Sequence, residues 1–164
     1  MIQGDFLSPS LSRNRTAFEL EARSKIAGQW HERFGIPEQV FDSFSFYRRA
    51  QNVWAFSDTA LPKLSYEAIG LRMMNFKEEP WKPTSCALQV FGRHATKNAV
   101  HLNREQSGIF FAGKSQVLEA NVDPGYVVVF YNGDVLGCGL YSHGKLISQL
   151  PKERRISGDA EMDI

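Results

Sequence analysis

The chain has 164 residues and a net charge of +1, and 43% of its residues are hydrophobic. This length suits one domain or two very small ones, and the hydrophobic content is sufficient for a packed core, which excludes a chain that is disordered throughout. No apolar run reaches the roughly 18 residues of a membrane span, and the N-terminus lacks the pattern of a secretory signal. Two isolated cysteines, Cys86 and Cys138, form no disulfide framework, so we expect a cytoplasmic protein without a membrane partner.

Helical periodicity marks the N-terminal part of the chain. Apolar residues recur at helical spacing over residues 16–34, and Gly35 followed by Pro37 is a typical stop signal. Residues 37–43 predict a second, short helix. One long helix and one short helix are therefore expected before the first strand.

Strands are expected next in the chain. Residues 44–49 and 52–57 are rich in aromatic residues, which favour strands. Residues 59–65 contain a proline and predict a loop. Residues 66–76 are either a strand or an irregular segment, because Gly70 lies in their middle.

A proline-rich run at residues 78–83 predicts a domain boundary, since two prolines within four residues exclude a helix there. Thr84 or Ser85 is then expected to cap a helix that continues to about Lys97. Three short elements follow: a strand at 100–102, a helix or turn at 104–112, and a strand at 117–120.

The last third of the chain carries the clearest pattern. Residues 126–131 form a continuous β-branched and aromatic run, typical of a strand that is covered on both faces. Asn132-Gly133 is a strong hairpin signal, because both residues tolerate positive φ. Return strands are expected at 135–141 and 145–150, with a turn at His143-Gly144. Three strands in close succession predict an antiparallel meander, and a small mixed β-barrel is the natural closure.

No catalytic or metal-binding motif is present in the sequence. There is no phosphate-binding loop, and Gly137-Cys138-Gly139 lies within an expected strand, which is the wrong context for a dinucleotide site. In a strand, the two glycines favour a bend or a close backbone approach, and Cys138 is expected to be a buried core thiol. The four histidines form no ligand pair. We therefore predict no catalytic residue, no metal and no cofactor.

Basic residues are concentrated in the second half. Residues 79–158 carry 9 Lys or Arg against 6 Asp or Glu, and no carboxylate occurs from Pro80 to Arg104. On the expected helix, Gln89, Arg93 and Lys97 recur every four residues, and Asn98 follows at its end. Such a stripe suits contacts with nucleic-acid phosphates, although an ordinary solvated helix face has the same pattern.

A second basic cluster follows the meander. It consists of Lys145, Lys152, Arg154 and Arg155, whereas Lys82 belongs to the first basic window, from Pro80 to Arg104. These residues suit the rim of a nucleic-acid-binding barrel, or else a charged sheet edge that discourages pairing with other strands. Residues 47–49 form a weaker third candidate, in which an aromatic residue precedes two arginines. Trp81 and Tyr141 are candidates for stacking on unpaired bases or for core packing.

Five segments in order carry a resemblance to a known family; they are residues 82–93, 97–102, 125–129, 136–140 and 149–152. Together they resemble the PUA-like RNA-binding domain, and most closely the version appended to Sun-family RNA cytosine-5 methyltransferases and found in stand-alone archaeal relatives. The resemblance implies a compact pseudo-barrel that docks tRNA or rRNA and orients a partner or fused enzyme. No cofactor-binding segment or Pro-Cys catalytic motif precedes it in this sequence, so it implies RNA binding rather than methyl transfer.

We therefore expect an α+β fold, in which a small N-terminal α/β, pre-PUA-like module at 1–78 is followed by a PUA-like mixed β pseudo-barrel at 79–156 and an acidic tail at 157–164. The expected function is non-catalytic binding of structured rRNA or tRNA in ribosome biogenesis or RNA modification, alone or beside an RNA methyltransferase or other modification enzyme acting in trans. The expected RNA contacts are Lys82, Gln89, Arg93, Lys97, Asn98, Lys145, Lys152, Arg154 and Arg155.

Two other functions remain open at this point. One is a protein-interaction module of an RNA-modification complex, which would present a large exposed apolar patch. The other is an enzyme on a PUA-related barrel, which would need an enclosed pocket with convergent polar groups. Glu67, Glu119 and Asp123 are the acids that would serve such a pocket.

Overall fold

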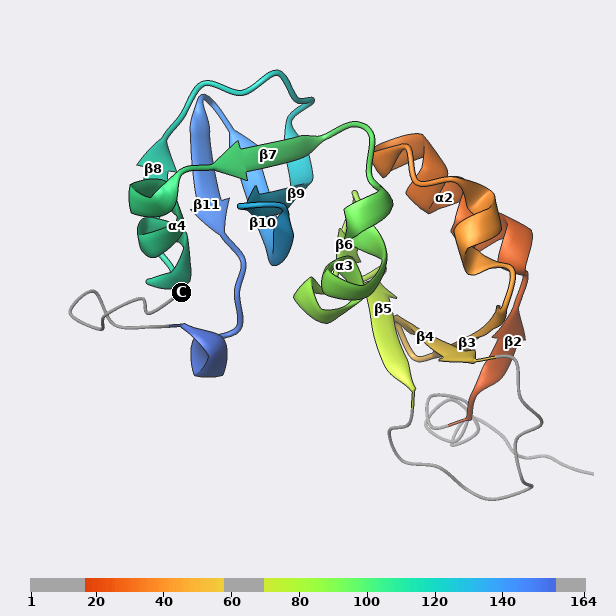
Figure 1. Cartoon of the computed structure of the whole chain (residues 1–164). Helices are drawn as coiled ribbons and strands as arrows, with labels where there is room; N and C mark the ends of the chain where they lie inside the picture. Colours follow the sequence, from red (N-terminus) through yellow and green to blue (C-terminus); the bar gives the residue numbers. More distant parts are fainter. Residues whose placement is uncertain (1–16, 58–69, 156–164) are drawn as a thin grey trace, which may run out of the picture.

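Residues 17–57 and 70–155 are described by the computed structural model, and their strands form two five-stranded sheets (Figure 1). The strand order is β2-β3-β4-β5-β6 in the first sheet and β7-β9-β10-β11-β8 in the second. The second sheet is mixed and curls into a half-barrel, because β7 runs parallel to β9 while the other pairs are antiparallel. The α+β class expected from the sequence is confirmed. The expected loop at 59–65, the acid Glu67 and the tail at 157–164 lie outside the described residues.

The elements of the first part are β2 (Glu19–Glu21), α2 (Arg23–Phe34), the 3₁₀ helix η1 (Glu38–Phe41), β3 (Phe44–Arg49), β4 (Asn52–Ser57), β5 (Leu71–Asn75) and β6 (Lys82–Pro83). The elements of the second part are α3 (Ser85–Phe91), the 3₁₀ helix η2 (Gly92–His94), β7 (Ala99–Leu102), α4 (Arg104–Phe111), β8 (Ser115–Val117), β9 (Gly125–Tyr131), β10 (Asp134–Ser142), β11 (Lys145–Ser148) and the 3₁₀ helix η3 (Lys152–Arg154).

The first helix is shorter than the sequence pattern suggested. It begins at Arg23 rather than near residue 16, because Glu19–Glu21 pairs antiparallel with β3 as an edge strand. Leu20 is 73% exposed on this strand, so its place in the helical pattern was misleading. The helix ends where expected, at Gly35, whose φ of 67° is the left-handed conformation of a helix C-cap.

The helix expected from Thr84 or Ser85 to about Lys97 also ends early. Thr84 caps α3 as predicted, with its Oγ1 accepting a hydrogen bond from the Ala87 backbone N–H at 3.0 Å. The helix stops at Phe91 instead of Lys97, and the chain turns toward α2. The backbone N–H groups of Thr96 and Lys97 then donate to the Phe34 carbonyl oxygen at 2.9 and 3.1 Å. Because these amides have a partner on another element, the helix does not continue.

The meander of β9, β10 and β11 is confirmed, with a hairpin at Asn132-Gly133, where both residues have positive φ. The strand expected at 117–120 is instead β8, which pairs with β11 and begins two residues earlier than the pattern indicated, at Ser115. The close approach expected at the glycines of β10 is also present. A Cβ on Gly139 would lie 2.6 Å from a methyl carbon of Leu146, so no larger residue fits without movement.

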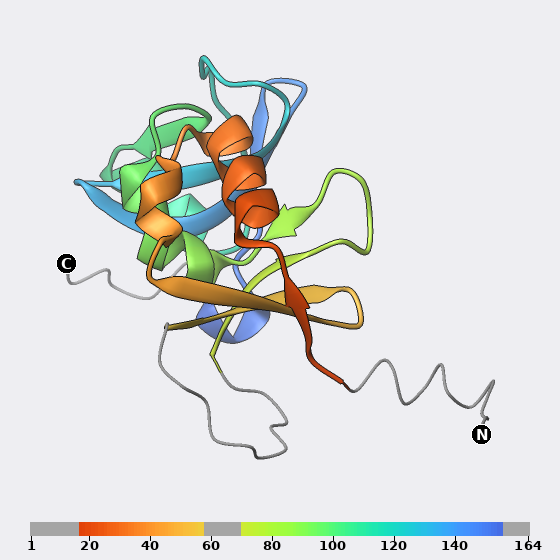
Figure 2. The same ribbon diagram turned by 90° about the vertical axis from the view of Figure 1, so that its right-hand side faces the viewer.

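One core joins the two sheets. Side chains of α2, α3 and both sheets pack in a single buried cluster, in which Trp30 and Phe34 meet Phe91 and Val128. Figure 2 shows α2 and α3 stacked over the strands of the first sheet. The strand β6 belongs to the first sheet, although it lies at the expected boundary of 78–83. The division into modules at 1–78 and 79–156 therefore remains a prediction.

A second buried cluster lies on the other face of the curled sheet, where Val127, Val129 and Leu146 pack against Phe110 of α4. Asn103 caps α4 in a reciprocal capping box with Gln106, which explains why the helix begins at Arg104. The two clusters hold α3 and the segment after β11 at the junction of the sheets.

Candidate nucleic-acid interface

A cleft of about 550 Å³ opens at the junction of the two sheets. One wall comes from β5 and β6 of the first sheet, the floor from residues 84–86 at the start of α3, and the other wall from residues 149–155 after β11. Segments that are far apart in the sequence line this cleft together.

Four cationic side chains line this cleft, which we call the basic cleft. They are Arg72, Lys82, Lys152 and Arg155, and none of the described lining residues is an acid. Like charges that converge without a neutralising carboxylate create a positive potential, and a concave surface focuses it. The basic cleft is therefore suited to an anionic ligand.

Hydrogen bonds hold the first wall against the floor. The Thr84 hydroxyl donates to the Arg72 carbonyl oxygen at 2.5 Å, and the Thr84 backbone N–H donates to the Met73 carbonyl oxygen at 3.0 Å. Lys82 lies opposite Asn75 in the pairing of β5 with β6, and its ammonium is 5.8 Å from the ring centre of Tyr126. Arg72 and Lys82 thus project from strands rather than from a mobile loop.

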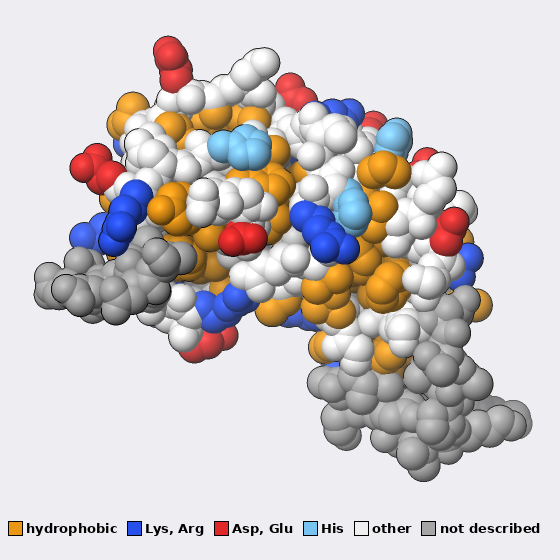
Figure 3. Space-filling view, viewed as in Figure 1, with side chains coloured by type: hydrophobic (Ala, Val, Ile, Leu, Met, Phe, Trp, Pro, Cys, Tyr) orange, Lys and Arg blue, Asp and Glu red, His pale blue; other side chains and the backbone are white. Residues whose placement is uncertain are grey.

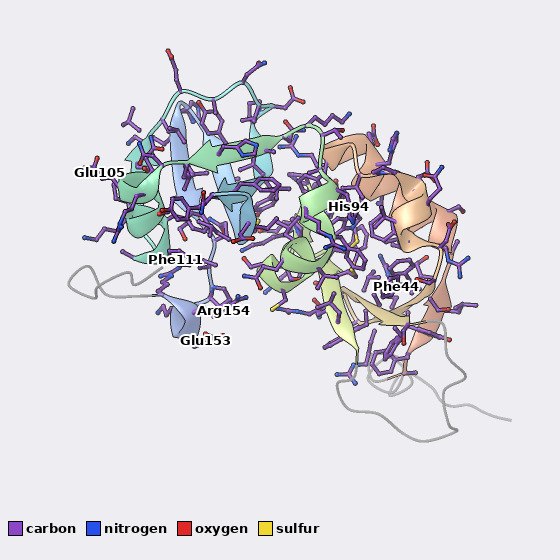
Figure 4. The ribbon with its side chains drawn as sticks, viewed as in Figure 1. Phe44, His94, Glu105, Phe111, Glu153 and Arg154 are labelled. Carbon is purple, nitrogen blue, oxygen red and sulfur yellow. The ribbon has the colours of Figure 1, made fainter. Side chains whose placement is uncertain are left out.

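The second wall is tied to the rest of the molecule through its arginines. Arg155 Nε donates to the Leu150 carbonyl oxygen at 3.0 Å, and Arg154 Nη1 lies 3.3 Å from Cys86 Sγ on α3. In Figure 4, Arg154 lies on the side of η3 nearer to α3, whereas Glu153 lies on its outer side. The acid of this segment is exposed and does not line the basic cleft.

The other expected contacts lie elsewhere. Lys145 is exposed at the hairpin between β10 and β11, at the opposite end of β11 from the basic cleft. Arg93 and Lys97 are exposed beyond the last residue of α3, and Arg93 Nε is 3.3 Å from His94 Nε2. Gln89 is exposed, but its amide donates to the Leu136 carbonyl oxygen at 2.9 Å. The single helical stripe expected from the four-residue spacing is therefore not formed, because α3 ends before both Arg93 and Lys97.

Asn98 has a structural position. It is 5% exposed, with a φ of 55°. Its Nδ2 donates to the Arg33 carbonyl oxygen at 2.6 Å, and its Oδ1 accepts from the Asp123 backbone N–H at 2.8 Å. Because both ends of the amide are used inside the protein, we leave Asn98 out of the proposed RNA contacts.

The face around Lys97 is mixed in charge. Lys97 and Arg33 line a depression together with Glu32 and Asp123. Basic, acidic and histidine side chains are likewise interspersed over the face of the molecule that Figure 3 shows. This face therefore attracts an anion less strongly than the basic cleft does.

The arginines at 48–49 and the aromatic candidates Trp81 and Tyr141 have partners inside the protein. Arg48 lies 3.2 Å from Glu21 Oε2 and 4.6 Å from the Phe76 ring centre, and Arg49 lies over the Phe18 ring. Trp81 stacks on Trp30 at 5.5 Å between ring centres. Tyr141 is buried, and its hydroxyl donates to the Leu118 carbonyl oxygen. Trp81 and Tyr141 are thus packed side chains, the second of the two roles that the sequence allowed.

Sequence reasoning missed Arg72. The sequence pattern of residues 66–76 fits either a strand or an irregular segment, because Gly70 lies in their middle. In the structure Gly70 has a φ of 76° just before β5 begins. The sequence does contain a signal, because Arg72 directly precedes two apolar residues, Met73 and Met74. In the structure the methionines are buried and Arg72 is exposed. Only the tertiary structure, in which β5 pairs with β6, brings Arg72 and Lys82 to the same cleft.

The two cysteines differ in environment. Cys138 is 1% exposed, and burial raises the pKa of its thiol to about 12, so it is an inert core residue as expected. Cys86 is exposed and lines the basic cleft. Among the described residues, no three His, Cys, Asp or Glu side chains gather in an arrangement able to hold a metal ion.

The acids that would serve an enzyme pocket and the exposed apolar residues that would form a protein-interaction patch do not gather in one place among the described residues. Glu119 is exposed and Asp123 lies beside Lys97, so neither lines the basic cleft. The large exposed hydrophobic side chains described here, Leu20, Val90 and Val117, lie on three different elements.

Comparison with known families agrees with the geometry of the second sheet. Residues 97–156 match the family described as the methyltransferase RsmF PUA domain. The chain contains a PUA-like domain. This domain includes the curled sheet and the basic wall at 149–155, while residues 7–70 match a family of unknown function, DUF7122.

Relatives that match 73–89% of this chain carry the name ribosomal RNA small subunit methyltransferase F. The protein from Vibrio cholerae is 22% identical over 134 residues, which are 80% of this chain and 28% of that protein. The protein from Aliivibrio fischeri is 24% identical over 89% of this chain and 29% of its own length. The protein from Aeromonas hydrophila is 25% identical over 73% of this chain and 25% of its own length. The chain thus spans little more than a quarter of the length of these relatives, and the similarity extends beyond the PUA-like domain. In the described part of the chain, no helix has the length and apolar character needed to cross a membrane.

Proposed function

We propose that this protein is a non-catalytic RNA-binding protein that uses the basic cleft beside its PUA-like domain as the main contact surface. The observation that carries the proposal is the convergence of four cations without an acid among the described lining residues. Phosphate contacts of this kind release condensed counterions, which provides most of the affinity of sequence-independent binding.

We infer that ribosomal RNA is the favoured target, with tRNA as a second candidate. Support comes from the relatives, whose name describes methylation of small-subunit rRNA. The chain matches about a quarter of their length. We therefore propose that it acts in ribosome biogenesis or RNA modification in the cytoplasm, alone or beside a modification enzyme acting in trans.

Within this proposal, the expected contacts fall into two groups. Lys82, Lys152 and Arg155 line the basic cleft, and Arg154 lies at its rim near Cys86. Gln89, Arg93, Lys97 and Lys145 lie outside it and would contact RNA that extends past the cleft. Arg72 joins the first group.

The test is an equilibrium titration of fragments of small-subunit rRNA and of bulk tRNA at several salt concentrations. If four cations each neutralise one phosphate of a single strand, the logarithm of the association constant should fall with the logarithm of salt by a slope of about 2.8, from roughly 0.7 per phosphate. Absence of binding at low salt would reject RNA binding as an activity of the chain on its own.

A further inference from the structure

The shape of the basic cleft restricts the kind of RNA it can accept. Its volume of about 550 Å³ lies within the roughly 300–1,000 Å³ of pockets that enclose a small molecule. A duplex carries its phosphates on a convex outer surface, which contacts flat or outward-facing cations but does not enter a concave site of this size. The cations here converge on a concavity instead.

The walls are also partly apolar. Leu71 and Pro83 line the side of the first sheet, and Leu150 and Pro151 line the opposite side. A hydrated phosphate gains nothing from such walls. A nucleobase does, because its face is apolar while its attached phosphate is anionic.

One neutral side chain of the basic cleft is suited to reading a base edge. The Thr84 hydroxyl bonds Arg72 and Ala87, and the Ser85 hydroxyl accepts from the Cys138 backbone N–H at 2.9 Å, so both serve the fold. Among the described residues, the one side-chain hydrogen bond of the Gln149 amide is a long contact of 3.5 Å to the Ile147 carbonyl oxygen. It is therefore placed to exchange that contact for a hydrogen bond to a ligand.

We propose that the basic cleft holds one unpaired nucleotide of an RNA strand. Its phosphate and those of the neighbouring nucleotides lie among the cations, its base packs between the proline-lined walls, and Gln149 bonds the base edge. The inference rests on the proposed RNA-binding function and makes it specific, since the chain then selects single-stranded positions over duplex.

Cys86 provides a reporter for this site. The sequence has two cysteines, and Cys138 is buried, so a thiol-alkylating reagent should modify the exposed Cys86. We would measure the alkylation rate of the full chain with a single-stranded oligoribonucleotide, with the same oligonucleotide annealed to its complement, and with inorganic phosphate. RNA binding by each form would be followed in parallel by fluorescence anisotropy, and Cys86→Ser would show that the signal comes from Cys86.

The expected result is at least about tenfold slower alkylation with a saturating single strand, and little change with duplex or phosphate. If the single strand binds but leaves the rate unchanged, or if duplex protects equally, the nucleotide site is wrong while RNA binding stands. If phosphate protects as well as the single strand does, the cleft is a simple anion site and the inference fails. If no RNA binds, the proposed function itself fails.

A substitution at Gln149 distinguishes the contribution of base contacts to RNA affinity from the contribution of charge. Gln149→Leu keeps the size of the side chain and removes its hydrogen bonds. Single-strand affinity should fall several-fold with an unchanged salt slope, because no phosphate contact is lost. Unchanged affinity for every homopolymer tested would remove Gln149 from the site.

Discussion

Neutralising two cations on opposite walls of the basic cleft is the most direct test of where RNA binds. Arg72 projects from β5 and Lys152 from η3, and both are exposed at the cleft. Among the described residues, neither side chain has a hydrogen bond or an ion pair that the fold depends on, so the double variant Arg72→Gln, Lys152→Gln should fold normally. Thermal unfolding would verify this.

The size of the effect follows from counterion release. Each phosphate contact with a single strand contributes roughly 0.7 to the salt slope, so two lost contacts should lower it by about 1.4. At about 0.1 M salt this corresponds to roughly 25-fold weaker binding, from 10 raised to the power 1.4. Fluorescence anisotropy with a labelled single-stranded RNA at several salt concentrations measures both quantities.

A matched control removes the same charges from another surface. Arg93→Gln with Lys97→Gln also neutralises one arginine and one lysine, beyond the end of α3. The salt slope of RNA binding should differ less from the wild-type value in this control than in the cleft variant. If the control weakens binding as much as the cleft variant, or if the cleft variant keeps the wild-type slope, then the basic cleft is not the main contact and the reasoning from its geometry is refuted.

Three further predictions concern the fold around the site. Gly139→Ala should lower the free energy of unfolding by about 1–3 kcal/mol in urea denaturation, because the new Cβ would lie 2.6 Å from a methyl carbon of Leu146; an unchanged midpoint would contradict this close packing. Asn98→Ala should lower stability by about 1–3 kcal/mol through its lost internal hydrogen bonds and leave the RNA affinity of the folded protein unchanged, so a specific loss of affinity would return Asn98 to the interface. Burial raises the pKa of Cys138 from 9.0 to about 12, so between these pH values the unfolded chain loses a proton that the folded chain keeps, and stability falls as pH rises, by up to about 1.4 kcal/mol per pH unit. Cys138→Ala should make the pH dependence of the free energy of unfolding, measured by urea denaturation, shallower by that amount, and an identical slope in the two proteins would contradict it.

Local patterns in the sequence were sufficient for several elements. Strands β3 and β4 lie where expected, and the meander of β9 to β11 follows from a β-branched run and an Asn-Gly turn. These features depend on neighbouring residues only, because a two-residue turn sets the register of the strands beside it. The expectation of a PUA-like domain is confirmed by the family match at 97–156.

Element ends were decided by contacts from elsewhere in the chain. The helix α2 begins later than expected, because Glu19–Glu21 pairs with β3 as a strand. The helix α3 ends at Phe91, and the backbone N–H groups of Thr96 and Lys97 donate to the Phe34 carbonyl oxygen. Periodicity cannot reveal such partners, because a backbone amide is satisfied equally well by its own helix or by another element.

The sequence by itself determined the basic character of the second half and the strands that form the curled sheet. Only the tertiary structure decided which cations act together. Arg72 and Lys152 meet across one cleft, while Asn98, next to Lys97 in the sequence, is buried and bonded to Arg33 and Asp123. The electrostatic potentials of exposed charges reinforce one another only within a screening length of about 10 Å at 0.1 M salt. Strand pairing and the shared core decide which charges lie that close, and spacing along the chain does not.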